Sequence, residues 1–253
     1  MHLEEFAQGD SVIHYLDPRV KITTALSFSL VMAVAARFPV LLAGLVAALA
    51  VTALTRLPWG RILARLAVVN AFVLFLWLFL PFSHPGRVLF TLGPLAATDE
   101  GVRHALVITL KSNAIILAVL SLLSTSRVFA LVHALRHLYL PEKLVNLFFF
   151  SFRYFQVIHL EYLRLRAAMK VRCFTPGTNL HTYRSLGWLM GMLLVRSFDR
   201  SERVYQAMLC RGYQGKLWIL SHFHFHGRDW VFLAAAAVFI ILLAVAEWTN
   251  LPL

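Results

Sequence analysis

Charged side chains are scarce in this sequence. Only 14% of its 253 residues are charged, whereas 60% are hydrophobic, and the mean hydropathy is +0.72. Water-soluble domains carry about 25% charged residues. The shortage of charge therefore excludes a water-soluble globule and predicts an all-α, polytopic membrane protein.

Acidic side chains are the scarcer kind, with 12 Asp and Glu against 24 Lys and Arg and a net charge of +12. Such an excess of positive charge can indicate a nucleic-acid-binding protein. Here the basic residues alternate with apolar runs, and the sequence has no RNP, zinc-finger or helix-turn-helix pattern. The pattern argues against nucleic acid as a partner and favours the lipid bilayer.

Catalytic motifs are lacking as well. The sequence contains no GxxxxGK[ST] phosphate loop, no HExxH zinc helix and no GxSxG nucleophile elbow. We therefore expect a protein that is not an enzyme and has no cofactor. Any energy from ATP would have to arrive through partner proteins.

Cysteine is limited to Cys173 and Cys210, each beside an arginine near the end of an expected helix. We expect both ends in the cytosol and far apart, so the two cysteines are interpreted as free thiols. The first residues include Glu4, Glu5 and Asp10 rather than a basic region followed by an apolar one, and no cleavable signal peptide is expected.

Long apolar runs are what the sequence does have, at residues 20–36, 40–54, 66–82, 105–123 and 231–248. The second run is short for the roughly 20 residues of a perpendicular span. Basic residues gather between the second and third runs and in segment 127–228, as is typical of cytoplasmic loops. The pattern predicts about five transmembrane helices with a cytoplasmic N-terminus and an external C-terminus.

This count divides the chain into three parts. Residues 1–125 are predicted to form a membrane domain with four transmembrane helices, residues 126–229 a cytoplasmic domain of long helices, and residues 230–253 a last transmembrane helix. In the cytoplasmic part the apolar stretch 186–195 is too short to span a bilayer. Gly187 and Gly191 lie in that stretch at a spacing that permits close helix packing.

A short phrase occurs twice in the cytoplasmic part. Residues 168–174 read Ala-Met-Lys-Val-Arg-Cys-Phe, and residues 207–213 read Ala-Met-Leu-Cys-Arg-Gly-Tyr. Pro or Gly follows each copy, so each copy is expected to end a long helix with an arginine at its tip. One such arginine is explained by the helix dipole, worth about 0.3 to 1 kcal/mol. The duplicated context favours a function for the pair.

Residues 177–180, 192–203 and 207–215 resemble the transmembrane coupling subunit (T component) of energy-coupling factor transporters, most closely the cobalt/nickel branch, the CbiQ type. In that family two Ala-Arg-Gly-like motifs at the tips of cytoplasmic coupling helices insert into two ATPase subunits. Here the Ala is replaced in both motifs and the Gly in the first alone. The motifs fall on Val171, Arg172 and Cys173, and on Cys210, Arg211 and Gly212.

The resemblance implies a non-catalytic scaffold in a prokaryotic plasma membrane. Such a scaffold transmits ATP-driven motion from two ATPase subunits to a substrate-binding membrane subunit, which captures cobalt or nickel. A similar Asp-Pro-Arg-x-Lys segment, here residues 17–21, marks the N-terminal part of the family. By its residues alone, this segment is a well-capped helix start at the membrane interface.

Two alternative readings use other residues. Lys111 lies well inside an apolar run, where a charge is a functional candidate, and a stand-alone secondary carrier could use it. Snorkelling toward an interface, or a structural hydrogen-bond cluster with Asn113 and Asn70, is the favoured explanation of Lys111. His222, His224 and His226 have a spacing that could ligate a metal in an extended segment, although they also suit an interfacial band.

Overall fold

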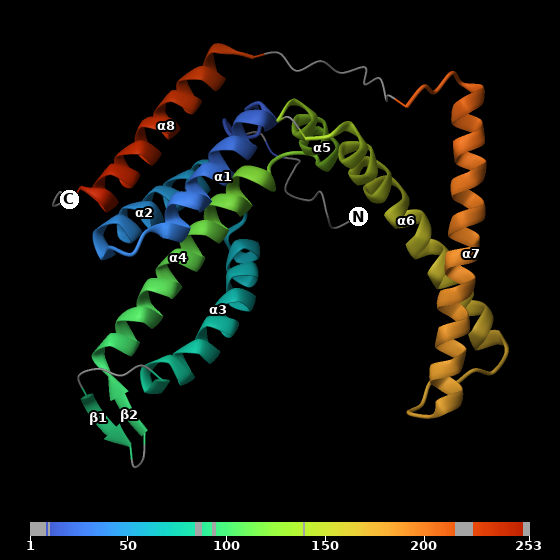
Figure 1. The fold of residues 1–253 in the computed structure, drawn as a ribbon, viewed down its shortest axis with the longest axis horizontal. Coiled ribbons are helices and arrows are strands. Elements are labelled where there is room, and N and C mark those ends of the chain that lie inside the picture. Colours follow the sequence, from blue (N-terminus) through green and yellow to red (C-terminus); the bar gives the residue numbers. More distant parts are fainter. Residues whose placement is uncertain are drawn as a thin grey trace. The chain divides into compact units, whose positions relative to one another are not determined.

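The computed structural model describes residue 9 and residues 11–83, 88–92, 95–138, 140–215 and 225–249. The described chain is helical apart from one antiparallel hairpin, so the all-α prediction is confirmed (Figure 1). The hairpin pairs β1 (Val88–Leu92) with β2 (Leu95–Thr98). The helices are α1 (Pro18–Val34), α2 (Phe38–Leu54), α3 (Trp59–Ser83), α4 (Asp99–Leu123), α5 (Val128–His137), α6 (Glu142–Val171), α7 (Leu180–Cys210) and α8 (Gly227–Trp248).

The chain forms two compact units. The membrane unit comprises the described residues within 1–138 and 223–253, and the coupling-helix unit comprises those within 139–222. The helix α5 lies within residues 126–229, the predicted cytoplasmic domain, and its contacts group it with the membrane unit. The chain therefore passes between the units twice, after α5 and before α8.

Three helices of the membrane unit, α3, α4 and α8, are long and apolar enough to cross a bilayer. The helices α1 and α2 have 17 residues each, or about 26 Å at 1.5 Å per residue. The outward faces are apolar too, as at Val68 and Leu74 of α3, which are 74% and 72% exposed. The chain is a multi-pass membrane protein, and the count of five spans stays a prediction.

The helices α1 and α8 run parallel and are tied at both ends. At one end the backbone N–H of Asp17 donates to the Asp229 carboxylate (2.9 Å). At the other end the Glu247 carboxylate accepts from the N–H of Ala36 (2.9 Å), and the Arg37 guanidinium donates to the carbonyl of Ala246 (3.0 Å). Both helices therefore begin on the same side of the membrane unit.

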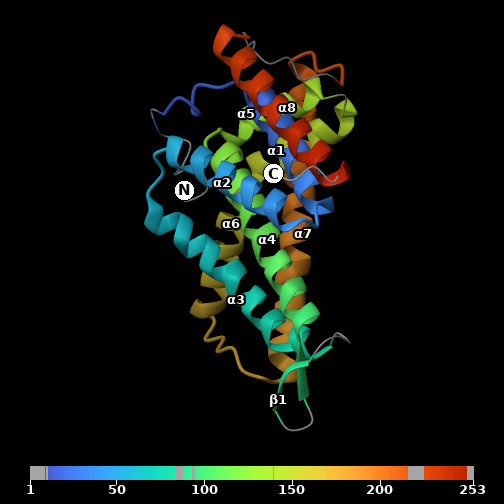
Figure 2. The same ribbon diagram turned by 90° about the vertical axis from the view of Figure 1, so that its left-hand side faces the viewer.

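The core of the membrane unit lies among α1, α2, α4 and α8, where Met32, Leu41, Ala114 and Leu243 are almost fully buried. The helix α3 packs on α4, and the β1–β2 hairpin joins these two helices at one end (Figure 2). We did not anticipate the hairpin from the sequence.

The coupling-helix unit is sparsely packed by comparison. Its two helices, α6 and α7, have 30 and 31 residues, yet the buried side chains on them are only Val145, Glu161, Thr182 and Leu189. Large apolar side chains on α7 are exposed instead: Trp188 and Leu194 are each 72% exposed and Phe198 is 69% exposed. Two long helices are thus presented with their apolar faces uncovered by the described chain.

Candidate functional site

The first arginine tip, at the end of α6, is a Schellman cap. Arg172 is the C-cap residue, and Cys173 follows it in the left-handed conformation with φ of 57°. The N–H of Cys173 donates to the carbonyl of Lys170 (3.0 Å), and the N–H of Phe174 donates to the carbonyl of Met169 (3.1 Å). These two bonds satisfy carbonyls that the end of a helix leaves open.

The second tip, at the end of α7, repeats this geometry. Arg211 is the C-cap residue, and Gly212 takes the left-handed position with φ of 79°. The N–H of Gly212 donates to the carbonyl of Leu209 (2.9 Å), and the N–H of Tyr213 donates to the carbonyl of Met208 (3.0 Å). The duplicated phrase therefore encodes one cap twice, with Met, Arg and an aromatic residue at equivalent positions.

Both tips present their arginine to solvent. Arg172 and Arg211 are exposed, as are both flanking cysteines, and Val171 is 85% exposed. The cap fixes the backbone beneath each arginine, because the two bonds and the left-handed residue leave the turn little freedom. Each tip is a rigid, exposed mount for one guanidinium.

The tips lie at opposite ends of α7. The turn after Cys173 leads directly into the start of α7, whereas Arg211 ends that helix 31 residues later, at about 46 Å by helix rise. At the second end the Asn146 amide near the start of α6 donates to the carbonyl of Gly215 (3.4 Å). The helices α6 and α7 therefore run in opposite directions (Figure 1). Arg172 ends the first helix and Arg211 ends the second.

An ion pair joins the two helices between the tips. The Glu161 carboxylate of α6 accepts hydrogen bonds from Arg196 of α7 and from Arg164 (3.4 Å). The hydrogen bond from Arg196, more than the charges themselves, holds the pKa of Glu161 below its usual range. We did not predict this pair. Its signal in the sequence is that Glu161 is the single acid in residues 143–198.

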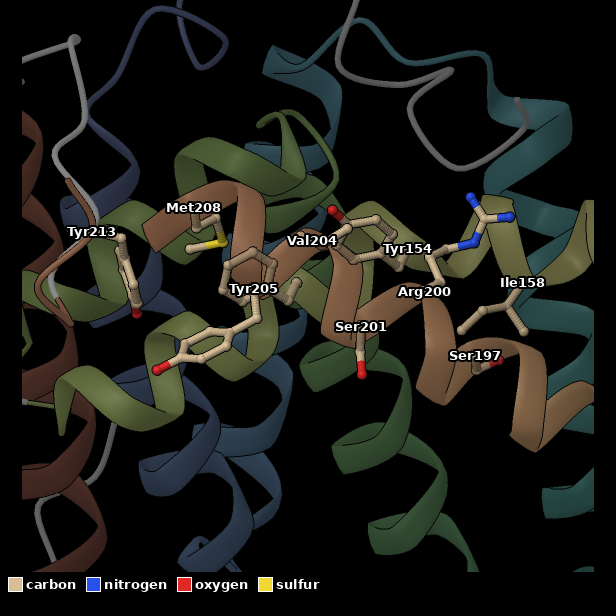
Figure 3. A pocket seen from close by; sticks show the side chains of 10 residues that line it. Tyr154, Ile158, Ser197, Arg200, Ser201, Val204, Tyr205, Met208 and Tyr213 are labelled. Atoms are coloured by element: carbon tan, nitrogen blue, oxygen red, sulfur yellow. The ribbon is translucent and has the colours of Figure 1, made fainter. Parts of the chain in front are cut away.

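A cavity of about 470 Å³ lies between α6 and α7 beside the second tip. Figure 3 shows Met208 and Tyr213 at one end of it and Ile158 and Ser197 at the other. Met208 and Tyr213 are also the two residues joined by the cap at Arg211. The rest of the wall is mostly apolar and aromatic: Phe150, Tyr154, Arg200, Ser201, Val204 and Tyr205.

The predicted helix-packing glycines lie on an open surface. A Cβ added at Gly187 or Gly191 would meet no atom of the described chain within 4 Å. The close helix approach expected there is therefore not made within the described part of this chain.

Lys111 makes a structural contact. Its ammonium donates to the carbonyl of Ala33 on α1 (2.8 Å). The amides of Asn70 and Asn113 bond each other reciprocally at 3.1 and 2.9 Å, as the sequence suggested, but Lys111 is not one of their bonded partners. The described geometry gives Lys111 a role in holding α4 to α1.

The proposed histidine cluster lies mostly outside the described residues, which include His226 but neither His222 nor His224. His226 is the N-cap of α8, and its backbone N–H donates to the Asp229 carboxylate (2.9 Å). Among the described residues no group of three His, Cys, Asp or Glu could hold a metal ion.

Comparisons with known proteins agree on one family. The model of the CbiQ family, described as cobalt transport protein, matches residues 9–219, which include both tips. The energy-coupling factor transporter transmembrane protein EcfT of Heliobacterium modesticaldum is 31% identical over 224 residues, covering 84% of each chain. The proteins of the same name from Bacillus subtilis and Limosilactobacillus fermentum are 28% and 30% identical, covering 85% and 82% of each chain.

Proposed function

The chain belongs to the CbiQ cobalt transport protein family and is a non-catalytic transmembrane component of an energy-coupling factor transporter. From this premise we propose that the two arginine tips couple two ATPase subunits to transport. The observation that carries the proposal is the twin cap. The chain builds the same arginine mount twice, at the two ends of one long helix pair.

Arginine suits a contact that must bear force. Its planar guanidinium makes forked hydrogen bonds to carboxylates and does not deprotonate at physiological pH. Arg172 and Arg211 each extend from a backbone held by two cap bonds. A displacement of either arginine is therefore transmitted to the whole of α6 or α7, because the turn beneath it is rigid.

Two equivalent tips fit two equivalent partners. A separation of about 46 Å by helix rise leaves room for one ATPase subunit at each tip. Because the continuous helix α7 keeps the two tips at a fixed distance, ATP-driven closure of the ATPase pair would rotate one tip against the other. The Glu161–Arg196 pair, placed between the tips, would hold α6 and α7 together during this motion.

The uncovered face of α7 fits the third partner, a substrate-binding membrane subunit. Gly187 and Gly191 leave the backbone open for about one turn, and Trp188, Leu194 and Phe198 expose large apolar surfaces on the same helix. Small residues four apart allow another helix to approach closely. The family description supports cobalt as the cargo of that subunit, and the resemblance to the cobalt/nickel branch adds nickel as the other proposed cargo.

Charge and the parallel helices support the orientation that we propose. The basic loop with Arg56, Arg61 and Arg65 marks the side on which α2 ends, and cytoplasmic loops carry such an excess. Since α1 and α8 begin on the same side, both enter from the cytoplasm in this scheme. We place the N-terminus and the coupling-helix unit in the cytoplasm, at the plasma membrane of a prokaryote.

The natural cysteines make this proposal directly testable. Cys173 and Cys210 are exposed beside the two arginines, so a membrane-impermeant maleimide should label both in inside-out vesicles and neither in right-side-out vesicles. Bound ATPase subunits should protect both thiols. Labelling from the outside, or labelling that ATPase binding leaves unchanged, would refute the orientation or the contact.

The decisive variant is the double change Arg172→Ala with Arg211→Ala. It should abolish co-purification of the ATPase subunits without nucleotide and should abolish ATP-dependent uptake of cobalt or nickel. Arg203→Ala is the matched control, because Arg203 is an exposed arginine on α7 away from either cap. Should the double variant retain ATPase and transport at the rate of the control, the coupling role of the tips is wrong.

A further inference from the structure

The first turn of α1 contains a buried lysine that a simple helix start does not require. Asp17 caps the helix by accepting from the N–H of Arg19 (2.8 Å), and Pro18 occupies the first helical position. Lys21, one turn further, has 0% of its surface exposed. Burying an ammonium is costly unless hydrogen bonds compensate, and an apolar residue of similar length would serve packing as well.

The bonds of Lys21 all reach other segments of the membrane unit. Its ammonium donates to the Ser126 hydroxyl (2.8 Å), to the Thr125 hydroxyl (3.3 Å) and to the carbonyl of His14 (3.4 Å). Thr125 and Ser126 form the turn between α4 and α5. Lys21 thus holds the start of α5, which is the last element before the chain leaves the membrane unit.

The same turn of α1 also holds the segment by which the chain returns. The N–H of Asp17 donates to one oxygen of Asp229 while the N–H of His226 donates to the other, both at 2.9 Å. The guanidinium of Arg19 lies 5.9 Å from the centre of the Phe225 ring. Asp229 is 2% exposed, so this junction is buried at the start of α8.

We propose that the first turn of α1 is a positioning site that holds the two elements next to the chain connections between the membrane unit and the coupling-helix unit. Lys21 holds the turn that leads into α5, ahead of the departing connection, and Asp229 is held at the start of α8, just after the returning one. The inference rests on the proposed coupling function. Motion imposed at the arginine tips can pass covalently into the membrane unit only through these two connections. If the elements next to these connections are held rigidly, motion of α6 and α7 moves the helices of the membrane unit and does not merely extend the connecting segments.

The test uses Lys21→Met in the full transporter complex, because Met keeps the length of the side chain and removes every donor. Co-purification of ATPase and the rate of ATP hydrolysis should stay within twofold of the unchanged protein, since both tips are intact. Uptake should fall at least tenfold. In the same complex, amide hydrogen exchange should rise at least tenfold in residues 126–137 and stay unchanged in α2.

Lys111→Met is the matched control, since it removes the ammonium that bonds Ala33 elsewhere in the same unit. All four measurements should stay within twofold for this control. Asp229→Asn is the second variant, because it keeps the size of the side chain and weakens the returning connection. It should uncouple hydrolysis from uptake in the same way and raise exchange in residues 226–232.

Uptake at the normal rate in both variants would overturn the proposal. So would loss of ATPase co-purification or of folded protein in both, which would make the turn a stability element only. The coupling function fails at a different step, since it is refuted when the double arginine variant keeps its ATPase. The two proposals can therefore fail separately.

Discussion

The two arginine tips have the same backbone and different residues at its most demanding position. Gly212 adopts φ of 79° at little steric cost, whereas Cys173 adopts φ of 57° with a Cβ present. The left-handed conformation costs an ordinary residue about 1 to 2 kcal/mol. The position of each arginine therefore depends on the cap geometry. The first tip keeps this geometry although Cys173 replaces the glycine that suits the left-handed position best.

The tips also differ in what supports them. Behind the first, the Phe174 and His181 rings lie 6.3 Å apart, and the N–H of Gly177 donates to the Thr182 hydroxyl (3.1 Å). Behind the second, Tyr213 and Met208 line the 470 Å³ cavity. The contacts of the following turn support the first tip, whereas the second tip lies beside a cavity. We therefore expect a substitution in the cap to destabilise the second tip more than the first.

Among single changes, removal of either arginine has the largest expected effect. Arg172→Ala or Arg211→Ala should weaken the ATPase contact at its own tip by roughly thirtyfold, since a buried interface anchor is typically worth about 2 kcal/mol. Maleimide protection should be lost at Cys173 in the first variant and at Cys210 in the second. Loss of protection at both cysteines in a single variant would mean that the tips do not act independently.

The second effect breaks the geometry of one tip and keeps its arginine. Gly212→Ala should cost about 1 to 2 kcal/mol at the left-handed position and weaken the second contact by roughly tenfold. Gly177→Ala is the control, because its added Cβ would meet only Asn179, at an ordinary 3.7 Å. Isothermal titration calorimetry of each variant with the ATPase subunit measures the two affinities. Equal affinities for Gly212→Ala and Gly177→Ala would show that the cap geometry does not affect ATPase binding.

A third change should make the tips more alike. Cys173→Gly relieves the left-handed strain but adds freedom to the unfolded chain, so the net gain should be about 0.5 to 1 kcal/mol. The first contact should tighten roughly two- to fivefold. Cys173→Ser keeps a Cβ and should bring no gain. An equal gain for serine would assign the effect to loss of the thiol.

The smallest effect concerns the ion pair between the tips. Because Arg196 lowers the folded-state pKa of Glu161, the contribution of this pair is complete above the unfolded value of about 4.3 and is lost as pH falls through the folded-state pKa. The protection factors of amides in the middle of α6, which are corrected for the pH dependence of intrinsic exchange, should therefore fall in acid below about pH 4.3. Glu161→Gln should remove this pH dependence, and a profile unchanged by that substitution would contradict the assignment.

The sequence predicted features that depend on neighbouring residues. Asp17 and Pro18 mark the start of α1, and Gly212 marks the end of α7, because caps are made by residues close in the chain. The positions of both arginines at helix tips followed from such signals.

Contacts between distant segments could not be read in this way. Lys21 and Ser126 are 105 residues apart, and Asp17 and Asp229 are 212 apart, so their meeting depends on how the helices pack. The resemblance of residues 17–21 to a family segment gave no hint that Lys21 is buried. The β1–β2 hairpin was missed for a different reason, since a short pair of strands is a weak signal beside long apolar helices.

The exposed apolar surface of α7 has a consequence for how the cell makes this protein. A newly synthesised copy without partners presents Trp188, Leu194 and Phe198 on a helix pair with few buried side chains of its own. Such surfaces are recognised by chaperones and proteases and promote aggregation. We therefore expect that expression of the chain alone yields less intact protein than co-expression with the partner subunits that we propose for it.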